Sequence, residues 1–113
     1  MNLGHYAACL FGGAFLMNSV PHVVAGAMGR PLQSPFAKPP GRGLSSSIVN
    51  VLWGFFNLVV AWVLLAGTGG FDVRAWGDAL AAGAGALAIA AHLALHFGRF
   101  NGGKLASGEP PPR

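Results

Sequence analysis

The sequence predicts an all-α fold, an integral membrane bundle of three transmembrane helices joined by loops. Hydrophobic residues make up 53% of the 113-residue chain and charged residues only 9%, whereas a soluble domain carries about 25% charged residues. Three uncharged apolar runs cover residues 3–28, 48–66 and 79–97. Each run approaches or exceeds the roughly 20 residues that a helix needs to cross a bilayer. Residues 1–98 are therefore expected to form a single transmembrane domain, followed by a disordered tail at 99–113.

The first run, residues 3–28, is expected to be a helix that proline disturbs. Pro21 has no backbone N–H and leaves the carbonyl of Met17 without its partner, so a kink or an early end is expected there. A cleaved signal peptide is the alternative, because the Ala-Gly-Ala at 25–27 resembles a cleavage site. The run is too long for that alternative, and no Lys or Arg precedes it.

The second run gives the clearest membrane signal in the chain. It reads IVNVLWGFFNLVVAWVLL from Ile48 to Leu65, without a charge. Serines at 45–47 stand where a helix N-cap belongs, and glycines follow the run where a helix stops. The alternative, a buried helix of a soluble protein, would need more protein than this short chain has to cover it on all sides.

The loop at residues 30–47 is expected to pack against the helix ends. Its four prolines exclude helix, and its glycines allow tight turns. It also contains Leu32, Phe36 and Leu44, which a solvated linker does not need. A flexible connector is the alternative interpretation.

The third run, residues 79–97, is the weakest membrane signal but suits helix packing. It is rich in Ala and Gly, and small residues let helix backbones approach closely in lipid. The short loop before it contains Phe71 and Trp76, which are expected at the level of the lipid headgroups.

The basic residues predict the orientation of the chain. Six of the seven Lys and Arg residues lie in the first loop and the tail: Arg30, Lys38, Arg42, Arg99, Lys104 and Arg113. Only Arg74 lies in the second loop, beside two aspartates. Because basic loops stay in the cytoplasm, the N-terminus is expected outside and the C-terminus inside.

Polar residues within the runs are expected to share one face of each helix. They are Asn18, His22, Asn50, Asn57, His92 and His96. Helical spacing combines them with small residues into stripes at 18 and 22, at 50, 54, 57 and 61, and at 81, 85, 88, 92 and 96. Phase and rise together predict that His22, Asn50 and His92 converge in the cytoplasmic half of the bundle.

Three interpretations of this polar cluster remain open. Asn and His side chains can fix the register of the helices by hydrogen bonding. They can instead form a ligand, proton or ion site, because intramembrane ionisable groups are often functional. Haem or metal ligation by His22, His92 and His96 is the third interpretation, since His92 and His96 are four residues apart.

Catalytic motifs are absent from the sequence. It contains no HExxH, CxxCH, nucleophile–base pair or phosphate loop, so no enzyme and no cofactor are predicted. The single cysteine, Cys9, cannot form an internal disulfide, and His5 stands apart at the opposite end from the other histidines. The aromatic residues do not alternate with basic ones, which argues against a nucleic-acid surface.

A composite motif runs from Asn18 to Gly54, about a third of the chain. Its parts are N-x-x-P-H (Asn18, Pro21, His22), G-x-x-G (Gly26, Gly29), S-P-F-A-K-P-P-G-R-G-L-S-S (Ser34 to Ser46) and N-x-x-W-G (Asn50, Trp53, Gly54). This pattern resembles a group of small bacterial integral-membrane proteins of unknown function. The resemblance implies a protein of the bacterial inner membrane and transfers no catalytic residue.

These features favour a non-enzymatic membrane protein, an accessory or interaction subunit of a membrane complex. Its expected partners are the lipid bilayer and other membrane subunits or a second copy, because a lone three-helix bundle exposes much surface. A small transporter or ligand-binding protein using the Asn/His cluster is the alternative. A haem- or metal-binding redox component is the second alternative.

Overall fold

Three long helices form the structure, a computed structural model that describes residues 2–68 and 70–103. The helices are α1 (Leu3–Ala27), α2 (Ser47–Trp62) and α3 (Trp76–Asn101), and α2 continues into a π-helical segment, η1 (Val63–Thr68). Each of the three is long and apolar enough to cross a membrane, with α2 and η1 counted as one span. The all-α, three-span fold predicted from the sequence is confirmed.

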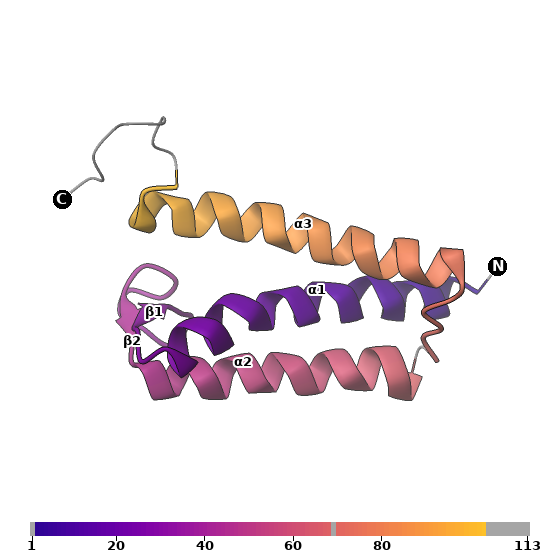
Figure 1. Cartoon of the computed structure of the whole chain (residues 1–113), viewed down its shortest axis with the longest axis horizontal. Coiled ribbons are helices and arrows are strands. Elements are labelled where there is room, and N and C mark those ends of the chain that lie inside the picture. Colours follow the sequence, from indigo (N-terminus) through magenta and orange to yellow (C-terminus); the bar gives the residue numbers. More distant parts are fainter. Residues whose placement is uncertain (1, 69, 104–113) are drawn as a thin grey trace.

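The helix α1 lies between the other two and packs against both (Figure 1). Glycines bring the backbones close at each interface, Gly26 and Gly54 between α1 and α2, and Gly13 and Gly85 between α1 and α3. At the second interface the contacts are reciprocal, because Gly13 faces the backbone of Ala82 while Gly85 faces the backbone of Leu10. The core is therefore a pair of close helix crossings centred on α1.

The helix ends can be compared with the prediction. The helix α1 ends at Ala27, close to the predicted 28, and it continues through Pro21, so the early end considered there does not occur. The helix α3 begins at Trp76 and ends at Asn101, so residues 99–101 of the predicted tail are helical. Hydropathy marks only the apolar part of a helix, whereas Gly102, with a φ of 81°, marks where the backbone turns out of it. Residues 104–113 of the predicted tail lie outside the described residues.

The loop between α1 and α2 folds back onto the helix ends, as predicted. Its two short strands, β1 (Leu32–Gln33) and β2 (Leu44–Ser45), pair antiparallel. Of the apolar side chains that motivated the prediction, Phe36 and Leu44 are 64% and 61% exposed, although the Phe36 ring lies edge-on to the ring of Trp53 in α2. Polar contacts add to this attachment.

The contacts that hold the loop come from buried serines and from side chains of α2 and α3. Within the loop, the hydroxyls of Ser34 and Ser45 lie 2.5 Å apart. The side-chain amide of Asn50 donates to the carbonyl of Leu32, and His96 donates to the carbonyl of Gly41. The loop is thus bound to both α2 and α3.

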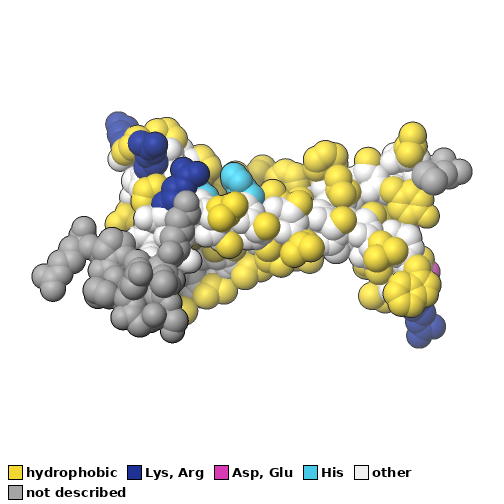
Figure 2. Space-filling model, turned by 90° about the horizontal axis from the view of Figure 1, so that it is seen from above, with side chains coloured by type: hydrophobic (Ala, Val, Ile, Leu, Met, Phe, Trp, Pro, Cys, Tyr) yellow, Lys and Arg dark blue, Asp and Glu magenta, His cyan; other side chains and the backbone are white. Residues whose placement is uncertain are grey.

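The surface is apolar along the helices and basic at one end. Figure 2 shows hydrophobic side chains along the length of the bundle and Lys and Arg side chains gathered at the end that carries the loop. Bulky side chains are exposed along α2, namely Leu52, Phe55, Phe56, Val59 and Trp62. An apolar surface of this extent suits lipid rather than water.

Candidate functional site

Polar side chains lie between the helices at three levels along the bundle. One level is at the loop end, one is near the middle, and one is at the opposite end, where α1 and α3 both begin. Among the described residues, seven polar side chains in the three helices or the adjoining loop are at most 6% exposed: Ser19, His22, Gln33, Ser34, Asn50, Asn57 and Asp78. Buried groups of this kind require partners, so each level is described by its contacts.

The middle level is a pair of asparagines that joins α1 to α2. The amide of Asn18 donates to the side-chain oxygen of Asn57 over 3.0 Å. The amide of Asn57 donates in turn to the carbonyl of Trp53, one turn earlier in the same helix. Asn57 is fully buried, so this contact fixes the register of the two helices away from solvent.

The loop end is organised by Asn50, which is fully buried. Its side-chain oxygen accepts a hydrogen bond of 2.7 Å from Nδ1 of His22. Its amide donates to three carbonyls, those of Leu32, Ser45 and Ser46, over 3.3, 3.1 and 3.0 Å. A single side chain therefore ties together α1, α2 and both strands of the loop.

A small cavity of about 140 Å³ adjoins this network. Its lining includes Asn18, His22, Gln33, Trp53 and His96. Among the described residues, the side-chain oxygen of Gln33 and the indole nitrogen of Trp53 are buried without a hydrogen-bond partner. One acceptor and one donor at a polar cavity of this size can be satisfied by water or by a small polar ligand.

The predicted polar face is found on α2 but not on α3. On α2 the buried residues are the four of the predicted stripe: Asn50, Gly54, Asn57 and Ala61. On α3 only Gly85 of the predicted stripe is buried, while Ala88 and His92 are exposed. Of the three residues predicted to converge, His22 and Asn50 are in contact, whereas His92 is exposed and lies outside their contact.

The position of His92 follows from the way α3 packs. The two close contacts of α3, at Ala82 and Gly85, lie in its first half. Toward its C-terminus α3 diverges from α1, and the loop occupies the space between the helix ends (Figure 1). His96 reaches this loop, whereas the ring of His92 stacks on that of His96 with 6.2 Å between centroids.

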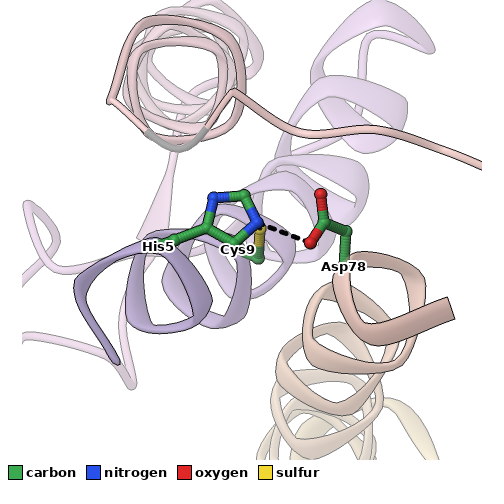
Figure 3. A group of neighbouring side chains, drawn as sticks. All are labelled: His5, Cys9 and Asp78. Carbon is green, nitrogen blue, oxygen red and sulfur yellow. Dashed lines mark hydrogen bonds and ion pairs between the residues drawn. The ribbon is translucent and has the colours of Figure 1, made fainter. Parts of the chain in front are cut away.

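The three histidines considered as metal or haem ligands do not gather at one point. His22 bonds to Asn50, His96 bonds to the loop, and His92 is exposed. Within the described part of the chain, three metal-ligating side chains come together only at the opposite end of the bundle, where His5, Cys9 and Asp78 meet (Figure 3).

Sequence reasoning missed this third level, although a signal existed. His5 and Cys9 are four residues apart and thus share a face of α1. Asp78 lies in the first turn of α3. In a bundle of three antiparallel helices the first and third begin at the same end, so these residues were to be expected at the same level of the bundle.

Compared with known proteins, the chain shows no match to a protein family, to a curated protein or to a solved structure.

Proposed function

We propose that this protein is a small membrane protein without enzymatic activity that acts as an accessory or interaction subunit of a membrane complex. The outward face of α3 carries the proposal. This helix packs against α1 and is the least buried of the three spans. Its exposed residues include Gly83, Ala84, Ala88, Ala91 and His92.

The composition of this face favours a protein neighbour over lipid. Small residues let a second helix approach closely, which is how helices associate in membranes. His92 adds a polar group, and polar groups in membrane spans are rarely left facing lipid. On α3 the exposed leucines at 80, 87 and 95 stand between small residues, whereas the exposed face of α2 carries large aliphatic and aromatic side chains that fill space against acyl chains.

The orientation belongs to the same proposal. At the loop end the described basic residues are Arg30, Lys38, Arg42 and Arg99, all exposed. At the other end Arg74 is accompanied by Asp72 and Asp78. By the positive-inside rule the loop end faces the cytoplasm, and the family resemblance supports a bacterial inner membrane.

Photo-crosslinking from within the membrane tests the proposed interface. A photoreactive amino acid at Leu87, 71% exposed on α3, should form adducts with another membrane protein or with a second copy. The matched control is Val59, 57% exposed near the middle of the α2 span, which should give adducts with lipid only. Adding bulk to the face with Ala88→Leu should reduce the Leu87 adduct several-fold. The proposed role would be contradicted if the photoreactive residue at position 87 formed no adduct with any protein in native membranes.

A further inference from the structure

Three potential metal ligands meet where α1 and α3 begin. The ring nitrogen Nε2 of His5 lies 2.5 Å from Oδ1 of Asp78. The sulfur of Cys9 lies 3.9 Å from the same nitrogen. The ligand atoms of all three residues lie within 4.8 Å of one another. Figure 3 shows the imidazole and the thiol of α1 directed toward the carboxylate of α3.

The arrangement differs from a catalytic relay. In a relay of thiol, imidazole and carboxylate, the two nitrogens of the ring serve different partners. Here both the sulfur and the carboxylate oxygen approach Nε2. Three donor atoms that lie within 4.8 Å of one another are close enough to bind a single metal ion.

The surroundings hold the carboxylate and the thiol in place. Asp78 is 5% exposed, and its second oxygen accepts a hydrogen bond of 2.9 Å from the backbone N–H of Asp72. Cys9 is fully buried. The His5 side chain is 24% exposed, so the cluster can be reached from the end of the bundle.

The donor set selects the class of metal. Thiolate, imidazole and carboxylate together are ligands of Zn²⁺ and related divalent transition metals, whereas Mg²⁺ and Ca²⁺ prefer oxygen alone. A thiolate and a carboxylate balance the two charges of such an ion. The loaded cluster would therefore carry no net charge, which suits a site next to hydrocarbon.

We propose that His5, Cys9 and Asp78 bind one divalent transition-metal ion of the Zn²⁺ class, with its fourth position open to solvent. Binding releases the Cys9 thiol proton to water and moves the His5 proton to Nδ1. Bonds of about 2.0–2.3 Å place neighbouring ligand atoms about 3.3–3.6 Å apart. The imidazole and the carboxylate must therefore separate by about 1 Å, while the sulfur is already near its place.

Cobalt provides the test, because Co²⁺ occupies zinc sites and gives a charge-transfer band when a thiolate binds it. The full-length protein is purified in detergent without a polyhistidine tag, stripped with a chelator and titrated with Co²⁺. We expect one equivalent to bind, with a thiolate band that Zn²⁺ abolishes. Cys9→Ala should remove the band and weaken Zn²⁺ binding. Loss of a group that only hydrogen-bonds to a metal ligand weakens binding about 10–100-fold, and loss of the ligand itself should have a larger effect.

Two further variants complete the test. His5→Gln should also weaken Zn²⁺ binding, whereas His92→Gln, which removes a histidine outside the cluster, should leave it unchanged. Thermal unfolding of each apo variant shows whether the fold is kept, and Cys9→Ala replaces one small buried side chain by another. A wild-type protein without the thiolate band, or one that binds Zn²⁺ no more tightly than Cys9→Ala, would overturn the proposal and leave an ion pair between the helices.

Discussion

Replacing Gly85 with alanine is expected to destabilise the packing of α3 on α1 by about 3 kcal/mol, the upper range for an overpacked interior. A Cβ atom at this position would overlap the carbonyl oxygen of Leu10 in the α1 backbone. Backbone cannot rotate out of the way as a flexible side chain can, so the two helices must separate. The midpoint of thermal unfolding in detergent measures the loss.

The matched control lies two residues away in the same helix. A Cβ at Gly83 would meet nothing within 4 Å. Gly83→Ala should therefore be neutral or should stabilise the protein by up to about 1 kcal/mol through helix propensity. Equal unfolding midpoints for the two alanine variants would show that α1 and α3 do not approach as closely as described.

Replacing Asn50 with leucine is expected to detach the loop and to destabilise the protein by about 2–4 kcal/mol. The change leaves the His22 ring N–H and the loop carbonyls without a partner in a buried place, and each orphaned group costs about 1–3 kcal/mol. Trypsin reports the detachment directly. Arg30 and Lys38 are each followed by proline, so cleavage in the loop occurs after Arg42.

Asn101→Leu provides the control for this prediction. Asn101 is exposed, and within the described part of the chain its amide donates to the carbonyl of Phe97 in its own helix and to no other group. Its loss should change neither the unfolding midpoint nor the rate of cleavage after Arg42. If Asn50→Leu is cleaved no faster than Asn101→Leu, the loop is not held by the Asn50 side chain.

The sequence was most informative about α2, because its polar and small residues stand out against bulky ones. Asn50, Gly54, Asn57 and Ala61 form the only stripe of their kind in that run, and all four are buried. The loop was also predictable, although the reason given was incomplete. Its large apolar residues suggested packing, whereas the buried side chains of the loop are Gln33, Ser34, Ala37 and Ser45.

The face of α3 could not be read in the same way. Alanine and glycine occur on every side of this helix, so a stripe of small residues on one face cannot be distinguished from the small residues on the other faces. The buried part of α3 depends on how far along the helix α1 stays in contact with it. The length of that contact depends in turn on the loop that lies between the helix ends. Ala88 and His92 were assigned to the interior for this reason, yet they are exposed.

The cluster of His5, Cys9 and Asp78 could not be recognised from the apolar runs alone. Asp78 lies just before the third run, and its role becomes visible only when α3 is extended back to Trp76. The distance between its carboxylate and the imidazole of His5 depends on the tertiary contact of α1 with α3. The spacing of His5 and Cys9 indicated a shared face but no partner for it.

The most direct test of three membrane spans is a set of reporter fusions that distinguish the two sides of the membrane. Fusions after Lys38, Arg74 and Lys104 sample the first loop, the second loop and the tail. Three spans with the basic loop in the cytoplasm predict signals inside, outside and inside, in that order. An outside signal at Lys38, or the same side for Lys38 and Arg74, would contradict the proposed arrangement.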